Sequence, residues 1–148
     1  MDNYMKLEFP AKSANESFAR AAVAAFAAQL DINVEEMADI KTAVSEAVTN
    51  AIVHGYRDVR GTVNIHCKIE GNSLHITVED FGAGIENVEQ AKQPLFTTGS
   101  EEERSGMGFT VMETFMDELC VESALDIGTK VHMVKIIGKG VSAEQNDD

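Results

Sequence analysis

The strongest apolar pattern in the chain lies in residues 40–55. Apolar residues recur there at the i, i+3, i+4, i+7 spacing of one helix face, namely Ile40, Ala43, Val44, Ala47, Val48, Ala51 and Ile52. Two polar residues, Glu46 and Asn50, interrupt the stretch four residues apart, so their side chains lie one helical turn from each other. The pattern predicts a helix that is buried on one face and carries a carboxylate and an amide on the same side.

Glu46 and Asn50 allow two interpretations, because buried polar groups need partners or cost several kcal/mol. In the first, both are structural and bond to a neighbouring loop. In the second, both face a wet cavity that holds a cation and a phosphate. The amide oxygen of Asn50 suits a hard cation, and the carboxylate of Glu46 could accept a proton from a nucleophile. The helix alone leaves both interpretations open.

Alternating apolar and polar residues predict the strands of the fold. The alternation is clear in residues 5–9, which Pro10 ends, and again in 63–69 and 74–78. Gly71 and Asn72 between the last two form a two-residue hairpin signal. A second hairpin is expected from 119–125 and 130–137.

Two capping signals mark helix starts between the first strand and the hairpin strands. Ser13 and Glu16 have the spacing of a capping box that opens a helix to about Leu30. Glu16 and Arg20 are also i,i+4 partners, which in the simplest interpretation form a surface ion pair worth ~0.5 kcal/mol. Asn33 and Glu36 have the capping spacing for the central helix. The expected inward stripe of the first helix is Phe18, Ala22, Ala25, Phe26 and Gln29.

Two glycine pairs stand where the chain could approach a ligand. Gly82 and Gly84 follow Asp80 directly after a predicted strand, and glycines there allow close backbone approach. Gly106 and Gly108 are predicted to open a helix with Val111, Met112, Phe115 and Met116 on its inner side. The N–H groups at such a helix start favour phosphate. Residues 93–105 between the two pairs show no steady period, which is typical of a lid over a site.

Composition restricts the class of protein. The length of 148 residues predicts one domain, residues 1–137, followed by a polar, flexible tail at 138–148. The net charge of −13 argues against direct binding of nucleic acid, and any anionic ligand needs a local positive environment. No apolar run is long enough for a membrane span and no charged leader is present, so a cytoplasmic protein is expected. Cys67 and Cys120 are too few for a disulfide framework and are expected to be buried thiols.

Three common phosphate motifs are absent from the sequence. There is no P-loop, and neither glycine pair has the third glycine of a dinucleotide fingerprint. Asp80, Phe81 and Gly82 spell the D-F-G of protein kinases, but the catalytic loop and strand lysine of that fold are missing.

The motifs that remain form an ordered set: Glu46 and Asn50, then Asp80 with its glycines, a lid, Gly106 and Gly108, and finally Gly128 with Thr129. This set resembles the motif series of the GHKL ATPases. Residues 15–20, 45–56, 94–98 and 103–113 further resemble the anti-sigma F factors of spore-forming bacteria, which are also serine kinases. The resemblance implies an α/β fold. It would be a two-layer sandwich with a mixed, mostly antiparallel sheet and helices on one face.

The same resemblance implies a role for each matching residue. Asn50 would hold Mg²⁺, and Glu46 would be the general base for a protein hydroxyl. Asp80 would accept the adenine amino group of ATP, supported by Thr129. Arg104 would place positive charge near the γ-phosphate. The remaining ATP contacts would come from Gly82, Gly84, Thr97, Thr98, Ser105, Gly106, Met107 and Gly108.

Family resemblance also implies partners. They are a sporulation sigma factor, a small anti-anti-sigma protein phosphorylated on serine, and a second copy of the chain in a homodimer. Glu16 and Arg20 would lie on the surface that meets the protein partners. Three alternatives are a switch kinase of a general stress pathway, a nucleotide-gated binding module without transfer, and a detached histidine kinase domain. The last is disfavoured because no helical hairpin with a phosphorylatable histidine precedes the motifs.

Overall fold

A five-stranded sheet forms one layer of the molecule, in the order β1-β2-β3-β5-β4. The computed structural model describes residues 2–55, 61–85, 87–88, 92 and 103–138, with the backbone alone for 54–55 and 103–107. Each neighbouring pair of strands is antiparallel. Most of the predicted lid and residues 139–148 of the predicted tail lie outside the described residues. The strands are β1 (Asn3–Pro10), β2 (Thr62–Glu70), β3 (Ser73–Asp80), β4 (Glu118–Ala124) and β5 (Gly128–Ile136).

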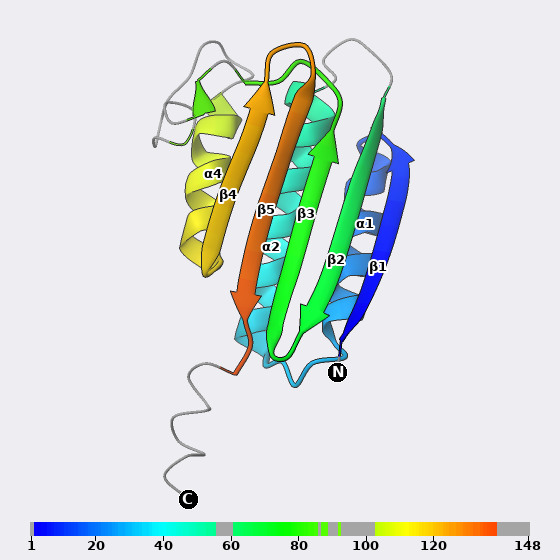
Figure 1. Ribbon diagram of the computed structural model, residues 1–148, viewed down its shortest axis with the longest axis vertical. Helices are drawn as coiled ribbons and strands as arrows, with labels where there is room; N and C mark the ends of the chain where they lie inside the picture. The colour runs from blue at the N-terminus through cyan, green and yellow to red at the C-terminus, as the bar shows by residue number, and fades with distance from the viewer. Residues whose placement is uncertain (1, 56–60, 86, 89–91, 93–102, 139–148) are drawn as a thin grey trace, which may run out of the picture.

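Helices form the second layer and cover one face of the sheet (Figure 1). They are α1 (Ala14–Ala27), α2 (Val34–Asn50) and α4 (Glu103–Phe115), and α2 continues into the π-helical turn η1 (Ala51–Gly55). The predicted two-layer α/β sandwich with helices on one face is therefore confirmed, although the sheet of the described strands is wholly antiparallel rather than mixed. In the described part of the chain, no helix combines the length and apolar character that crossing a bilayer requires.

The core lies between the two layers, as the alternating pattern predicts. The odd-numbered apolar residues of β2 and the even-numbered ones of β3 are all buried. The predicted face of α2 is buried from Ile40 to Ala51, and Ile52 is partly buried. Gly71 supplies the positive φ of 60° in the predicted β2–β3 turn. Burial of each large apolar side chain stabilises the fold by about 1.5–3 kcal/mol.

Helix α1 differs from its prediction in both its cap and its buried face. Ser13 makes no side-chain capping bond, so the predicted capping box is wrong. The buried face consists of Ala19, Val23, Ala24, Phe26 and Ala27, so of the predicted stripe only Phe26 is buried. Alanines occupy every side of this helix, so its periodicity did not define the face. Phe18 instead rests edge-on against Phe9 and stays 53% exposed.

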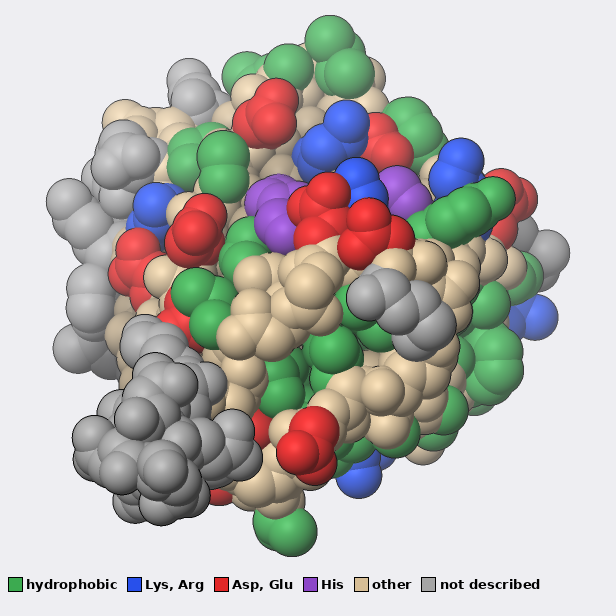
Figure 2. Space-filling model, turned by 60° about the horizontal axis from the view of Figure 1, so that its bottom comes forward, with side chains coloured by type: hydrophobic (Ala, Val, Ile, Leu, Met, Phe, Trp, Pro, Cys, Tyr) green, Lys and Arg blue, Asp and Glu red, His purple; other side chains and the backbone are tan. Residues whose placement is uncertain are grey.

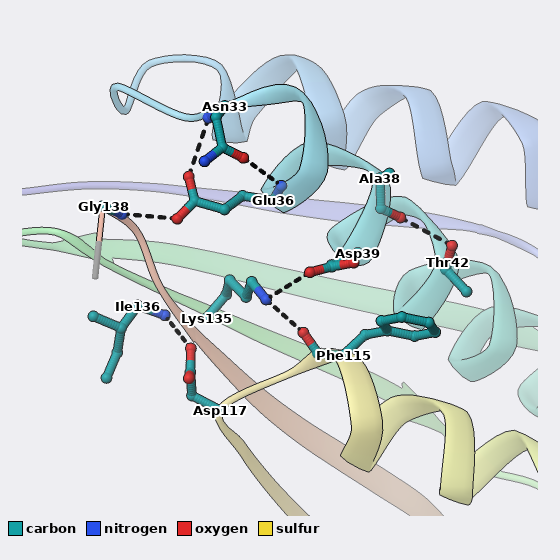
Figure 3. Close-up of polar contacts among 10 residues, drawn as sticks. All are labelled: Asn33, Glu36, Ala38, Asp39, Thr42, Phe115, Asp117, Lys135, Ile136 and Gly138. Carbon is teal, nitrogen blue, oxygen red and sulfur yellow. Dashed lines mark hydrogen bonds and ion pairs between the residues drawn. The ribbon is translucent and has the colours of Figure 1, made fainter. Parts of the chain in front are cut away.

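Helix α2 begins with the predicted capping box (Figure 3). The side chain of Asn33 accepts from the Glu36 N–H at 2.7 Å, and the Glu36 carboxylate accepts from the Asn33 N–H at 3.0 Å. The other carboxylate oxygen of Glu36 accepts from the Gly138 N–H at 2.8 Å. The cap thus joins the start of α2 to the end of the sheet.

Helix α4 begins at Glu103, three residues earlier than the predicted start at Gly106. Glu103, Arg104 and Ser105 are all compatible with helix, so the glycines did not mark the boundary. Phe109, Met112 and Met116 face the core. The predicted inner residues Val111 and Phe115 are only partly buried.

None of the described helices covers the outer face of the sheet, which carries charged and histidine side chains (Figure 2). Cys120 is exposed, so its predicted burial is wrong. Because helices cover only one side, alternate residues of the edge strand β4 face outward. Cys67 points inward, and burial raises the pKa of its thiol to about 12.

Candidate functional site

Glu46 and Asn50 of α2 face the backbone of α4 at Gly108. Gly108 is buried, and a Cβ atom added to it would lie 3.1 Å from Glu46 Oε2 and 3.1 Å from Asn50 Nδ2. Those distances are tighter than ordinary van der Waals contact, so glycine is what allows α4 to come this close. Two motifs separated by more than fifty residues in the sequence are therefore brought together.

The Asn50 side chain has an unused hydrogen-bond donor. Its Nδ2 atom is buried and bonds to none of the described residues. A buried donor without a partner costs about 1–3 kcal/mol. This cost argues against the structural interpretation of Asn50, since a structural amide would be bonded to a neighbouring loop. It fits an amide that is completed by a ligand.

Glu46 is a carboxyl group with a raised pKa. Burial is the main cause, and the negative charge of Glu16 on α1 is the second. A raised pKa makes the ionised carboxylate a stronger proton acceptor, which suits a general base. The side chain is partly buried, so it can still meet a bound group.

Asp80 ends β3 and is the buried acidic side chain of the described residues, with 6% exposure. One of its oxygens accepts from the Gly82 N–H at 3.0 Å. Burial raises the pKa of Asp80, and hydrogen bonds from the Gly82 and Thr129 backbones partly oppose that rise. A buried carboxylate of this kind can select a ligand that donates a hydrogen bond to it.

The loop after Asp80 packs with its backbone directly against the β4–β5 turn. A Cβ atom on Gly84, where φ is 77°, would lie 2.1 Å from the Ala124 carbonyl oxygen. A Cβ atom on Gly128, where φ is 138°, would lie 2.1 Å from the Asp80 carbonyl oxygen. Both positions exclude any side chain, so both glycines shape the site.

Ser123 is a site residue that the sequence did not reveal. Its Oγ accepts from the Ile85 N–H at 2.7 Å, donates to the Gly128 carbonyl at 3.0 Å and lies 2.8 Å from Thr129 Oγ1. Because the single Ser123 proton goes to Gly128, Thr129 must donate to Ser123, which leaves lone pairs of Thr129 free to accept. The available signal was a serine that interrupts the inward series Leu119 and Val121.

The two groups of residues lie at the same end of the sandwich, on its helix side. The turn η1, which continues α2 beyond Asn50, contacts both β3 and β5. Figure 1 shows the end of α2, the end of β3 and the β4–β5 turn together at the top of the molecule. Glu46 with Asn50, and Asp80 with Thr129, can therefore serve one elongated ligand.

For most of the other predicted site residues, the structure describes the backbone alone or nothing. Thr97 and Thr98 lie outside the described residues, while Arg104, Ser105, Gly106 and Met107 belong to the first turns of α4. On α1, Arg20 Nε lies 3.7 Å from Glu16 Oε2, and 41% of the Arg20 side chain is exposed. The predicted i,i+4 ion pair is confirmed.

The residues at this site fit a magnesium nucleotide. In the described ranges, no three histidine, cysteine or acidic side chains gather as a metal cluster. Mg²⁺ rarely needs such a cluster, because it keeps several waters and is held by one or two protein oxygens together with phosphates. Asn50 can supply one such oxygen, and its buried Nδ2, which bonds to none of the described residues, can donate to a phosphate oxygen.

Comparison with known proteins defines the family. The profile of the histidine kinase-like ATPase domain matches residues 9–135. The anti-sigma F factor of Thermoanaerobacter sp. (strain X514) is 64% identical over 136 residues, which cover 92% of this chain and 95% of that protein. The anti-sigma F factor of Geobacillus thermodenitrificans is 59% identical over 140 residues, covering 94% and 96%. The chain belongs to the anti-sigma F factor family.

A solved structure supports the fold of this family member. The RsbU and RsbW domains of Rv1364c from Mycobacterium tuberculosis match 91% of this chain and 32% of that one, with a TM-score of 0.67. Because the sequence identity is only 20%, this match supports the fold and nothing further. The resemblance predicted from the motifs is therefore confirmed at the level of both family and fold.

Proposed function

We propose that this anti-sigma factor binds a sporulation sigma factor and transfers phosphate from ATP to a serine of a small anti-anti-sigma protein. The observation that carries the proposal is the meeting of Glu46, Asn50 and Gly108, with a buried amide nitrogen that lacks a partner among the described residues. Phosphoryl transfer uses a group that accepts the proton of the nucleophile and a ligand for the cation that binds the phosphates. Glu46 and Asn50 are such groups.

Phosphate binding would combine the end of α2 with the first turns of α4. Asn50 would hold Mg²⁺, whose charge would offset that of the phosphates. The N–H groups in the first turn of α4, residues 103–105, lack an acceptor within the helix and would donate to phosphate oxygens, and Arg104 would add positive charge. Gly106 and Gly108 would let the phosphates approach the helix closely. Further contacts would come from Thr97, Thr98, Ser105 and Met107. These local groups would answer the unfavourable net charge of −13.

Glu46 would act as the general base. It would take the proton from the serine hydroxyl as the serine oxygen attacks the γ-phosphorus. The bond from that phosphorus to the bridging oxygen would break, and ADP would leave with the electron pair. The raised pKa of Glu46 supports this role because it strengthens the acceptor.

Adenine selection would fall to Asp80 and Thr129. The Asp80 carboxylate would accept from the adenine amino group, and a free lone pair of Thr129 Oγ1 would support the same edge. Guanine carries a carbonyl oxygen where adenine carries the amino group. That oxygen and the Asp80 carboxylate are both acceptors, so they would repel each other and guanine would bind poorly. Gly82 and Gly84 would let the backbone pass beside the base.

Protein partners would meet the chain on α1. Arg20 is suited to this role because much of its side chain is exposed and its partner Glu16 keeps it oriented. We further propose that the chain acts as a homodimer, and that ATP rather than ADP favours the complex with the sigma factor.

The test is incubation of the purified chain with γ-labelled ATP, Mg²⁺ and a candidate anti-anti-sigma protein. We expect label on one serine of that protein, and none when EDTA is added. Gel filtration with the sigma factor in ATP and in ADP provides a second measurement. Binding of the sigma factor without any transfer of label would instead favour a nucleotide-gated binding module.

A further inference from the structure

Lys135 joins β5 to α2 and to the end of α4 (Figure 3). It lies near the end of β5, at the opposite end of the sandwich from the candidate site (Figure 1). Its Nζ lies 3.0 Å from Asp39 Oδ2 on α2 and donates to the Phe115 carbonyl oxygen at the end of α4 at 2.6 Å. Only 12% of the Lys135 side chain and 19% of the Asp39 side chain are exposed. Lys135 continues the inward series Val131 and Met133 of β5, where alternation would place an apolar residue.

Apolar packing specifies the position of α4 along its axis only weakly. The helix contacts the core through Phe109 and Met112, Met116 follows directly after the helix, and methionine adapts to many arrangements. Hydrogen bonds are directional, so the bond to the Phe115 carbonyl restricts the helix more sharply. The last turn of α4 contains no basic residue of its own. Lys135 therefore also supplies the positive charge that a helix C-terminus favours.

The same two helices meet again at the candidate site. The two helices are antiparallel (Figure 1). In α2 the chain passes from Asp39 at the Lys135 end to Asn50 at the site, and in α4 it returns from Gly108 at the site to Phe115 at the Lys135 end. The rise of a helix puts about 10 Å between Gly108 and Phe115. A Cβ atom on Gly108 would lie only 3.1 Å from Glu46 Oε2 and from Asn50 Nδ2, so α4 packs closely against these two side chains. A small axial shift of α4 would change that approach directly.

We propose that Lys135 is a positioning residue for phosphoryl transfer, which holds α4 against α2 so that the Gly108 backbone faces Glu46 and Asn50 at working distance. Lys135 itself touches neither nucleotide nor protein substrate. The inference rests on the proposed function for its effect on transfer. Its effect on α4, however, exists in the chain without ligand and can be measured there.

The decisive variant is the double substitution Lys135→Met with Asp39→Leu. Lys135→Met alone leaves a mostly buried carboxylate without its cation, which would destabilise the fold whatever the role of Lys135. Apolar replacement of both partners of a buried ion pair is often neutral for stability. The double variant therefore separates positioning from stability. Lys68→Met is the matched control, because it removes an ion pair of the same 3.0 Å length from the outer face of the sheet.

We expect the double variant to unfold at a urea concentration near that of the wild type. Amide hydrogen exchange at Gly108, Phe109 and Thr110 in the ligand-free chain should be about tenfold faster, because local opening of α4 becomes easier. The Kd for magnesium ATP should rise about tenfold, and kcat for transfer should fall by about tenfold or more, as expected for a misplaced site. Lys68→Met should leave all four quantities unchanged.

A stable double variant with wild-type exchange, ATP affinity and kcat would overturn the inference. Should the double variant prove unstable, Asp39→Asn is the second test, since it removes the charge but keeps an acceptor for Lys135. It should show smaller changes in the same direction, and wild-type exchange and affinity in it would also overturn the inference. Faster exchange and weaker ATP binding in the double variant would support the positioning role of Lys135, whether or not phosphate is transferred. Absence of phosphate transfer by the wild type would refute only the proposed function.

Discussion

The two ends of α2 differ in whether their polar side chains have hydrogen-bond partners. At the start, the polar side chains all have partners: Asn33 and Glu36 bond to each other in the capping box, Glu36 also accepts from Gly138, and Asp39 pairs with Lys135. Near the end, the Asn50 amide nitrogen is buried and bonds to none of the described residues, and burial raises the pKa of Glu46. One helix therefore has a satisfied end and an unsatisfied end.

This difference separates stability from function. Satisfied polar groups stabilise the fold and need nothing from outside it. Unsatisfied ones cost free energy in the free protein, and a ligand that completes them recovers that cost on binding. Substitutions in the Asn33–Glu36 cap should therefore change stability without changing activity, whereas substitutions near the end of α2 should lower activity without lowering stability.

The largest expected effect comes from Glu46→Gln. The amide cannot accept the serine proton, so kcat for transfer should fall by ~10²-fold or more while ATP affinity is kept. Rapid-quench assays with γ-labelled ATP give kcat, and calorimetry gives the affinity. Glu35→Gln is the matched control, since it makes the same chemical change on an exposed part of the same helix. Transfer at the wild-type rate in Glu46→Gln would remove Glu46 as the base.

Asn50→Ala should have the next largest effect. Without the amide oxygen, the Mg²⁺-dependent part of ATP affinity should fall by about 10- to 100-fold. Titration calorimetry with ATP in Mg²⁺ and in EDTA separates that part from the rest. Equal affinity of Asn50→Ala and the wild type in Mg²⁺ would contradict the cation role.

Gly108→Ala should weaken ATP binding by about tenfold, since overpacking typically costs 1–3 kcal/mol. The added Cβ would displace the ends of the Glu46 and Asn50 side chains, which can move without unfolding the chain. Alanine also favours helix by about 1 kcal/mol over glycine, so stability should change little. Loss of stability with unchanged ATP affinity would show that Gly108 is structural.

The pH dependence of stability provides a smaller effect of known sign. Because the folded chain raises the pKa of Glu46, its contribution to stability is present below the unfolded pKa and is lost as pH rises through the folded pKa. Glu46→Gln should therefore be more stable than the wild type at neutral pH, and equal to it below about pH 4. Urea midpoints at both pH values test this, and a less stable variant at neutral pH would oppose it.

The smallest functional effect is expected at the satisfied end of α2. Asn33→Ala should lower the free energy of unfolding by about 1 kcal/mol through loss of the cap. ATP affinity and kcat should not change. A large loss of ATP affinity in this variant would abolish the distinction between the two ends.

The sequence predicted the parts of the fold in which apolar and polar residues alternate strictly. The β2 and β3 strands and the face of α2 follow from such alternation, and the spacing of Glu46 and Asn50 places them together. The buried face of α1 could not be predicted, because alanines on all sides make several stripes equally apolar. The bond of Ser123 to Ile85 and that of Lys135 to Asp39 join residues far apart in the sequence, which no local pattern contains.

The most direct test of the account is the position of the metal in crystals grown with an ATP analogue and Mn²⁺ in place of Mg²⁺. Anomalous scattering locates Mn²⁺ independently of the surrounding density. The account predicts one peak about 2 Å from Asn50 Oδ1, beside the triphosphate and within reach of Glu46. A peak and nucleotide elsewhere, with Asn50 bonded only to protein, would contradict it.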